Sequence, residues 1–253
     1  MRRPGSRAAD MGAPSISDYW RSVEDFCREC RTRLKDSFVS LVVVGSLSVG
    51  DAIPGWSDVD AYLILESVTD EVRTKVAALV ADVTRKFPWY ATDRGSRFTV
   101  FPVSRGELRL GGPDVSFLSQ WDLKRHGVVA CGEDVTADLA VPELDRTWLD
   151  RNTEWMMQFL ARDHDAALEW KARNAIGFVL AGARVAILKG GTYAKAKQEI
   201  AQAFAQLHPE RFSTVGRAMQ CRGEWPRILN DPGAIDALYQ EATGFLRWVR
   251  DLP

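Results

Sequence analysis

Two carboxylates stand two residues apart in the stretch from Leu41 to Leu65, LVVVGSLSVGDAIPGWSDVDAYLIL. This stretch reads as two strands joined by a Gly/Ser-rich loop. Asp58 and Asp60 open the second strand, and a strand's alternation puts both side chains on one face. Neighbouring carboxylates repel each other unless a cation lies between them. A hard divalent ion, Mg²⁺ carrying a phosphate, fits this pair.

Other glycine-loop chemistries do not fit the same residues. Gly45 and Gly50 have the spacing of a Walker A loop, but Asp51 follows where that motif needs lysine. The dinucleotide-binding fingerprint fails because Leu47 takes the place of its second glycine. A nucleophile elbow fails because Ser46 replaces its first glycine. What remains is Gly-Ser, a spacer, and then Asp-Val-Asp.

That pattern resembles the DNA polymerase β-type nucleotidyltransferase superfamily, and within it the aminoglycoside adenylyltransferase branch. The resemblance implies that Gly45 and Ser46 hold the triphosphate of a nucleotide. It also implies that Asp58 and Asp60 are catalytic and bind the metal. Ser57, directly before the pair, is expected to join the nucleotide-binding residues.

The resemblance also implies a third carboxylate on a later strand. The run RFTVFPV, residues 97–103, predicts that strand, yet Arg97 and Thr99 occupy the face where an acid is needed. The nearest acids flank the strand: Asp93, Glu107 and Asp114.

Asp114 is the candidate for the third catalytic carboxylate, because the short apolar stretch after it could form a strand. Its alternative role is a turn or cap aspartate following Gly112 and Pro113.

A second resemblance lies in residues 188–201, LKGGTYAKAKQEIA. They resemble the Gly- and Lys-containing helix start in the C-terminal domain of aminoglycoside adenylyltransferases. The resemblance implies that Lys195 or Lys197 reaches the nucleotide phosphates across an interdomain cleft. The alternative is that both lysines only solvate a helix face.

The flanking segments predict the elements that position these residues. A helix is expected from about Ser17 to Ser37, with a capping box formed by Ser15 and Asp18. Apolar residues at helical spacing predict another helix over residues 70–87, ended by a proline. The order of helices and strands predicts a mixed sheet with helices on one side.

The second half of the sequence is helical throughout. Val141 and Pro142 mark a boundary, so we expect a disordered lead-in (1–14), a first domain (15–142) and a helical bundle domain (143–253). The tryptophans at 148, 155 and 170 have helical spacing and are predicted to lie in the core. The expected helices cover about 145–163, 166–188, 195–207, 212–221 and 232–250.

Composition narrows the class of protein and its location. A net charge of −1 gives no basic face for nucleic acid, and the longest apolar runs fall short of the ~20 residues of a membrane span. The first 14 residues lack the apolar core of a secretory signal. We therefore expect a cytoplasmic protein whose Cys27 and Cys30 are reduced thiols packed in the core.

The predicted fold is an α/β (α+β) nucleotidyltransferase domain with a mixed sheet, followed by an all-α helical bundle. The predicted function is Mg²⁺-dependent transfer of AMP from ATP to a hydroxyl of a small molecule, with an aminoglycoside-like antibiotic as one candidate acceptor. Two alternatives stay open: a nucleotide-binding protein that has lost catalysis, and an antitoxin-type nucleotidyltransferase acting on a protein partner. No oligomeric state is predicted.

Overall fold

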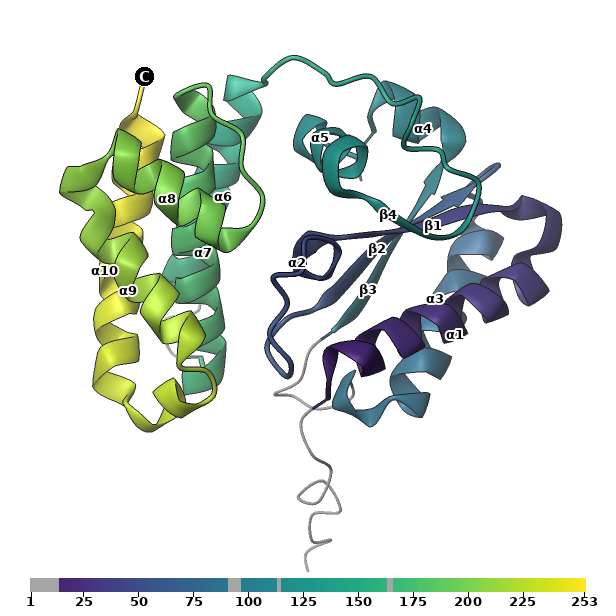
Figure 1. Ribbon diagram of the computed structural model, residues 1–253, viewed down its shortest axis with the longest axis horizontal. Helices are drawn as coiled ribbons and strands as arrows, with labels where there is room; N and C mark the ends of the chain where they lie inside the picture. The colour runs from purple at the N-terminus through teal and green to yellow at the C-terminus, as the bar shows by residue number, and fades with distance from the viewer. Residues whose placement is uncertain (1–13, 91–96, 113–114, 163–165) are drawn as a thin grey trace, which may run out of the picture. The chain divides into compact units, whose positions relative to one another are not determined.

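The computed structural model describes residues 14–90, 97–112, 115–162 and 166–253. The chain divides into two compact units, residues 1–141 and 142–253, which are treated separately below (Figure 1). Apart from Pro14, the expected lead-in lies outside the described residues. Short 3₁₀ turns occur at Lys35–Ser37, Pro88–Tyr90, Pro209–Arg211 and Arg227–Asn230.

One mixed sheet forms the centre of the first unit. Its strands are β1 (Phe38–Val44), β2 (Val59–Leu65), β3 (Phe98–Ser104) and β4 (Val128–Gly132). They lie in the order β3-β2-β1-β4; β1 is antiparallel to β2 and β4, and β2 is parallel to β3. The predicted mixed sheet is therefore confirmed. All of β1 after Phe38 is buried, as expected of a β-branched run covered on both faces.

Two long helices cover one face of this sheet (Figure 1). α1 (Ile16–Leu34) begins with the predicted capping box: Ser15 Oγ accepts the Asp18 N–H, and the Asp18 carboxylate accepts the Ser15 N–H. α3 (Asp70–Lys86) begins after Thr69, whose hydroxyl accepts the N–H of Val72. Both predicted helices are confirmed, and their apolar sides pack on β1 and β2.

The opposite face of the sheet is covered as well, so the prediction of helices on one side is wrong. α4 (Arg105–Leu110) and α5 (Phe117–His126) bring Leu108 and Leu123 onto Val42 and Ile64. The physical reason is that these strand residues are as apolar as their neighbours on the α1 side. Exposing that second face to water would forfeit its hydrophobic stabilisation.

The prediction that a strand could follow Asp114 is also wrong. Val115 makes an isolated bridge to Gly112, and α5 begins two residues later. Ser116 Oγ accepts the N–H of Ser119, which caps the helix and ends the extended conformation.

Within residues 142–162 and 166–253, five α-helices form the second unit, which confirms the predicted helical bundle. α7 is its central member: its C-terminal half is buried nearly all round and packs against the other four helices. The helices are α6 (Arg146–Arg162), α7 (Leu168–Lys189), α8 (Lys197–Leu207), α9 (Phe212–Gly223) and α10 (Pro232–Asp251).

The prediction that the bundle tryptophans lie in the core is wrong. Trp155 is 49% exposed, and Trp148 and Trp170 are half-buried. The core positions of α6 are taken by a neighbouring stripe that includes Leu149 and Met156. Helical spacing identified a shared face, but Trp155 instead joins Phe159 and other aromatic rings at the surface.

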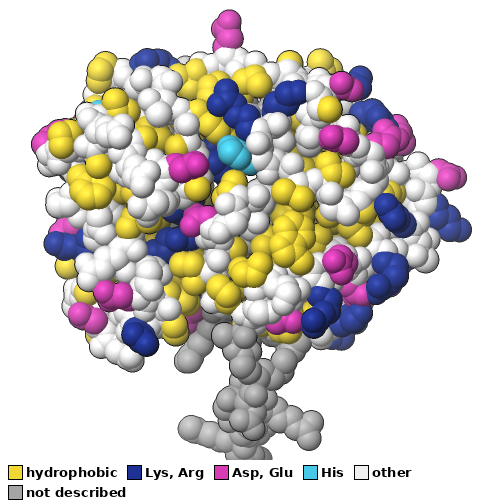
Figure 2. Space-filling view, viewed as in Figure 1, with side chains coloured by type: hydrophobic (Ala, Val, Ile, Leu, Met, Phe, Trp, Pro, Cys, Tyr) yellow, Lys and Arg dark blue, Asp and Glu magenta, His cyan; other side chains and the backbone are white. Residues whose placement is uncertain are grey.

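The surface carries both signs of charge. On the face shown in Figure 2, Lys and Arg side chains alternate with Asp and Glu, in keeping with the net charge of −1. Among the described residues, no helix combines the length and apolar character that a membrane crossing requires.

The cysteines depart from the expected reduced state. Cys27 on α1 and Cys30 are buried as predicted, but Cys27 forms a disulfide with Cys131 on β4. The sequence separation of 104 residues hid this pairing, since only the sheet brings β4 beside α1. Burial raises the pKa of Cys30 to about 12, so this thiol stays protonated and is unsuited to exchange with the disulfide.

We expect Cys131→Ser to lower the free energy of unfolding by about 2–5 kcal/mol in non-reducing buffer, because a long loop in the unfolded chain is no longer closed. Urea denaturation of both proteins measures the difference, and the same pair in reducing buffer is the control. In reducing buffer, the denaturation curves of the unmodified protein and the variant should nearly coincide. Equal midpoints without reductant would show that the two sulfurs are not bonded in solution.

Candidate active site

The glycine turn after β1 lies directly against one of the paired carboxylates. Gly45 begins α2 (Gly45–Ser48) with φ +76°, a left-handed conformation that glycine adopts without strain. A Cβ at this position would lie 2.9 Å from Asp60 Oδ2. The left-handed backbone favours glycine here, and a Cβ would displace the Asp60 carboxylate, so Gly45 and Asp60 lie directly against each other.

The loop between this turn and β2 is held by its own backbone and by α1. The Asp51 N–H donates to the Ser46 carbonyl at 2.9 Å, and the Gly55 N–H donates to the hydroxyl of Tyr19 at 2.8 Å. Tyr19 is fully buried on α1, so it ties the loop to the core of the unit. Ser57 is buried too, and its Oγ accepts the N–H of Ile53 at 2.9 Å.

Asp58 and Asp60 are placed by the pairing of β2 with its neighbours. Asp60 lies between Val44 of β1 and Thr99 of β3. Asp58 precedes the strand, and its Oδ1 accepts the backbone N–H of Arg97 at 2.7 Å. Both aspartates are half-buried. The structure thus positions two carboxylates at the end of β2 where the glycine turn passes.

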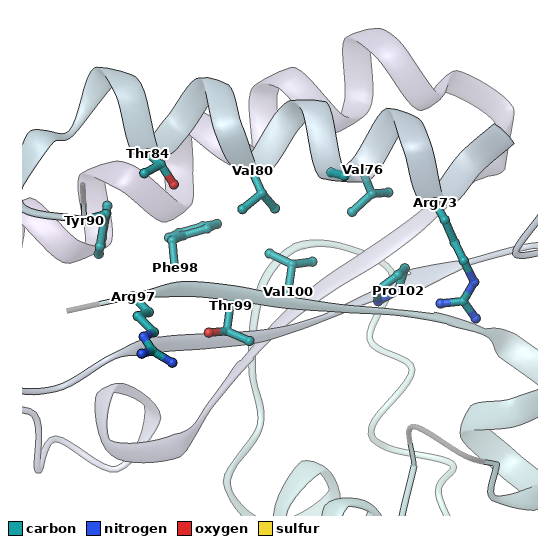
Figure 3. A pocket seen from close by; sticks show the side chains of 11 residues that line it. Arg73, Val76, Val80, Thr84, Tyr90, Arg97, Phe98, Thr99, Val100 and Pro102 are labelled. Atoms are coloured by element: carbon teal, nitrogen blue, oxygen red, sulfur yellow. The ribbon is translucent and has the colours of Figure 1, made fainter. Parts of the chain in front are cut away.

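The place beside Asp60 on the third strand is filled by Thr99. In a parallel pair, residues in register point to the same face of the sheet. The side chains of Thr99 and Asp60 therefore lie on one face. Figure 3 shows Arg97 and Thr99 pointing away from α3, on that same face. Among the described residues, no group of three or more His, Cys, Asp or Glu side chains could hold a metal ion.

The three acids considered for the third carboxylate differ in what the structure says of them. Asp114 and Asp93 lie outside the described residues. Glu107 closes the capping box of α4, where hydrogen bonds from Ser104 N–H and Oγ, and to a smaller degree the charge of Arg73, lower its pKa. A carboxylate fixed in a helix cap is a poor candidate for catalysis.

A buried tyrosine pair lies behind the carboxylates. Tyr90 stacks on Tyr19 with ring centroids 6.1 Å apart, and its hydroxyl is hydrogen-bonded to Ser22 Oγ at 2.7 Å. Burial raises the pKa of Tyr90 to about 12, and the charges of Tyr19 and Asp58 add to this. The phenol therefore stays neutral at physiological pH and adds no negative charge next to Asp58.

The donor set fits Mg²⁺, which prefers carboxylate oxygens and keeps several waters or phosphate oxygens as further ligands. A carboxylate has about four lone-pair sites, so the bond from the Arg97 N–H orients Asp58 without exhausting its capacity to bind a cation. Asp58 and Asp60 could hold such an ion, and a divalent cation would relieve the repulsion between them.

The two predicted phosphate-binding lysines belong to the second unit. Lys197 is the first residue of α8, and Lys195 lies in the connection before it; both are half-buried. This connection is held from α7, since Arg184 Nε donates to the Ala194 carbonyl at 2.9 Å. The contact of either lysine with a nucleotide stays a prediction.

Sequence reasoning missed three residues that support these segments: Tyr19, Tyr90 and Arg184. Apart from their apolar surroundings, nothing in the sequence indicated a supporting role for the two tyrosines, because their partners lie far away along the chain. Arg184 is buried within the apolar run of α7 from Ile176 to Leu188. A charged residue at such a position usually has a specific partner, and that signal could have identified it.

Comparison with known proteins defines the class of fold. No family model and no curated protein matches this sequence. Solved structures do match, and they show that the chain has the two-part fold of a nucleotidyltransferase of the aminoglycoside adenylyltransferase type.

One such structure is spectinomycin adenyltransferase AAD(9) from Enterococcus faecialis, solved with ATP and spectinomycin. The similarity covers 90% of this chain and 99% of that one, with a TM-score of 0.60 and 12% sequence identity.

We expect Gly45→Ala to lower the free energy of unfolding by about 1–3 kcal/mol and to weaken nucleotide binding, because the methyl group strains the turn and displaces Asp60. Chemical denaturation and the thermal shift with ATP and Mg²⁺ measure the two effects.

Gly50→Ala is the matched control for this variant. Gly50 also has a left-handed φ, +69°, but a Cβ there would meet no atom within 4 Å. The Gly50→Ala variant should have a lower free energy of unfolding because of backbone strain, but it should keep the thermal shift caused by ATP and Mg²⁺. An equal loss of that response in both variants would refute the steric link between Gly45 and Asp60.

Proposed function

We propose that this protein is a metal-dependent nucleotidyltransferase that transfers AMP from ATP to a hydroxyl of a small molecule. The observation that supports it most is the placement of Asp58 and Asp60 at one strand end, with Gly45 in contact with Asp60. The shared fold with an adenyltransferase solved with ATP supports the choice of nucleotide.

The first unit supplies the groups that position the donor. Asp58 and Asp60 would hold Mg²⁺, which when bound neutralises the triphosphate and polarises the α-phosphorus. Gly45 and Ser46 would hold the triphosphate through their backbone, and the missing Cβ of Gly45 would let phosphate approach closely. Ser57 would contact the nucleotide from the end of the loop. The rate gain comes from positioning and electrostatics.

The transfer step requires an acceptor and a base. The acceptor hydroxyl attacks the α-phosphorus, its oxygen forms the new P–O bond, and pyrophosphate leaves. We propose that Asp114 takes the proton from that hydroxyl, and that Lys195 or Lys197 binds the phosphates. The acceptor is proposed to be a small molecule of the aminoglycoside type, by analogy with the spectinomycin bound to the structural neighbour.

The proposed location is the cytoplasm, where ATP is the available donor. The Cys27–Cys131 disulfide would be an exception there, because cytosolic thiols are normally kept reduced.

One observation favours a second candidate function, a protein that binds the nucleotide without transferring it. Thr99 occupies the place beside Asp60 where a third carboxylate is expected. Threonine has no basic group at neutral pH, so it cannot deprotonate an acceptor hydroxyl. If Asp114 is not the base, the first unit would still bind Mg²⁺ and nucleotide, but the transfer step would lack the proton acceptor proposed for it.

We expect Asp60→Asn to abolish the rise in melting temperature caused by ATP with Mg²⁺, because the metal loses a ligand and the nucleotide loses its cation. Without metal, the melting temperature should stay the same or rise slightly, since the repulsion with Asp58 is relieved. Asp138→Asn, an exposed surface change, is the control and should respond like the unmodified protein. A full nucleotide response in Asp60→Asn would exclude it as a metal ligand.

We expect Asp114→Ala to lower the transfer rate by about two to four orders of magnitude while nucleotide affinity stays nearly unchanged, because a general base acts mainly in the transition state. Single-turnover kinetics measures the transfer rate, and a binding titration measures the nucleotide affinity. An unchanged rate would show that another group takes the proton. If the unmodified protein binds ATP and turns over none of a panel of hydroxyl acceptors, the nucleotide-binding function is favoured instead.

A further inference from the structure

The paired aspartates are preceded by a short turn, residues 53–57, that is closed by its own hydrogen bonds. The Ile53 carbonyl accepts the N–H groups of Trp56 and Ser57 at 3.0 and 2.9 Å. The Ser57 hydroxyl in return accepts the Ile53 N–H at 2.9 Å. Because these bonds join its two ends, the turn behaves as one rigid piece, and Asp58 is the next residue after it.

This turn is attached to α1 through a tyrosine hydroxyl. The Gly55 N–H, in the middle of the turn, donates to the Tyr19 hydroxyl at 2.8 Å. Tyr19 lies in the first turn of α1, directly after the capping box, and its side chain is fully buried. A side chain in a close-packed core has little freedom to move. The Tyr19 hydroxyl is therefore a fixed point that holds the turn.

The Asp58 side chain has a second attachment, on β3. Its Oδ1 accepts the backbone N–H of Arg97 at 2.7 Å. This bond forms only while the backbone of Asp58 stays at the right distance from β3, and the turn before it controls that distance. The charge of Asp58 also contributes to the raised pKa of Tyr90, whose ring stacks on Tyr19, so the carboxylate lies near the tyrosine pair.

We propose that Tyr19 is a positioning residue for the metal site: through Gly55 and the turn, its hydroxyl sets the place of Asp58 and thereby the affinity for a divalent cation. Tyr19 itself would touch neither the metal nor the nucleotide. The inference rests on the proposed function, because it takes Asp58 and Asp60 as the metal ligands. Groups that orient a metal ligand from behind typically change metal affinity by about 10–100-fold when they are removed.

A purely structural role for this hydroxyl would have a different consequence. Its removal takes away the acceptor of the half-buried Gly55 N–H, which lowers stability whether or not the metal site is affected. The neighbouring ring offers the comparison, since the Tyr90 hydroxyl is hydrogen-bonded at 2.7 Å to Ser22 Oγ, which lies on α1 and not on the turn. Loss of the Tyr90 hydroxyl removes a buried hydrogen bond but leaves the turn attached.

The test compares Tyr19→Phe with Tyr90→Phe in the full-length protein. Each variant removes one phenol oxygen and keeps a ring of the same shape in the core. The probe is Mn²⁺ alone, without nucleotide, because it prefers the same oxygen ligands as Mg²⁺ and is followed by electron paramagnetic resonance. We expect Tyr19→Phe to bind Mn²⁺ at least about tenfold more weakly, and Tyr90→Phe to stay within about twofold of the unmodified protein.

Hydrogen exchange of the metal-free protein gives a second readout. In Tyr19→Phe, the amides of Gly55 and Arg97 should both exchange at least about tenfold faster. The first loses its acceptor, and the second loses a firmly placed Asp58 carboxylate. In Tyr90→Phe, both exchange rates should stay as they are in the unmodified protein.

Ser57→Ala extends the test to the other end of the turn and replaces Tyr19→Phe if that variant does not fold. It removes the acceptor of the Ile53 N–H and leaves the Tyr19 hydroxyl in place. If the turn carries the effect, Ser57→Ala should also weaken the binding of Mn²⁺ alone, by at least about fivefold.

Equal Mn²⁺ affinity in Tyr19→Phe and the unmodified protein would overturn the inference and leave the proposed metal site intact. An equal loss in Tyr19→Phe and Tyr90→Phe, or unchanged exchange of the Arg97 amide, would also overturn it, because either result shows only a structural role. Failure of the proposed metal site would differ: the unmodified protein and Asp60→Asn would bind Mn²⁺ equally. The exchange of the Arg97 amide would then still decide whether Tyr19 positions Asp58.

Discussion

The close approach of the Gly45 turn to the Asp60 carboxylate is the constraint on which the first unit depends. It requires a residue without a Cβ in a left-handed conformation at the end of β1, and an acidic residue opposite it on β2. The antiparallel pairing of Val44 with Asp60 sets this distance, so the register of two buried strands fixes the geometry of the candidate metal site. A slip of one residue would turn the carboxylate to the other face of the sheet.

Keeping that register requires a loop that returns the chain from α2 to β2 without occupying the space before the carboxylates. The buried Tyr19 holds the loop at Gly55, and Ser57 closes its last turn against Ile53. Tyr90 packs on Tyr19 and stays neutral beside Asp58. The site is thus supported from behind by aromatic rings on α1 and in the 3₁₀ turn Pro88–Tyr90.

The parallel pairing of β2 with β3 has two consequences for the same strand. On one face it puts Thr99 beside Asp60, where a third acidic ligand is expected for two-metal chemistry. On the other face it leaves Phe98 and Val100 against α3 at the end of the sheet, with an apolar groove beside them. β3 is therefore both a neighbour of the paired carboxylates and an end strand of the sheet that the described residues form.

The sequence by itself determined the local features. The Gly-Ser turn, the spacing to Asp58 and Asp60, the capping box of α1 and the helices of the second unit follow from short-range patterns. Backbone conformation, capping and periodicity act within a few residues. It also indicated the class of fold, through the family resemblance that the glycine turn and the paired acids carry.

Only the tertiary structure decided what depends on contacts distant in sequence. The Cys27–Cys131 disulfide, the covering of the second sheet face by α4 and α5, and the surface position of Trp155 each result from which elements pack together. Helical spacing indicated that Trp148 and Trp155 lie on the same side of α6. It did not indicate which side of the helix faces the core. The register of β3 against β2, which placed Thr99 beside Asp60, is likewise set by pairing across the sheet. The sequence of one strand does not specify the strand beside it.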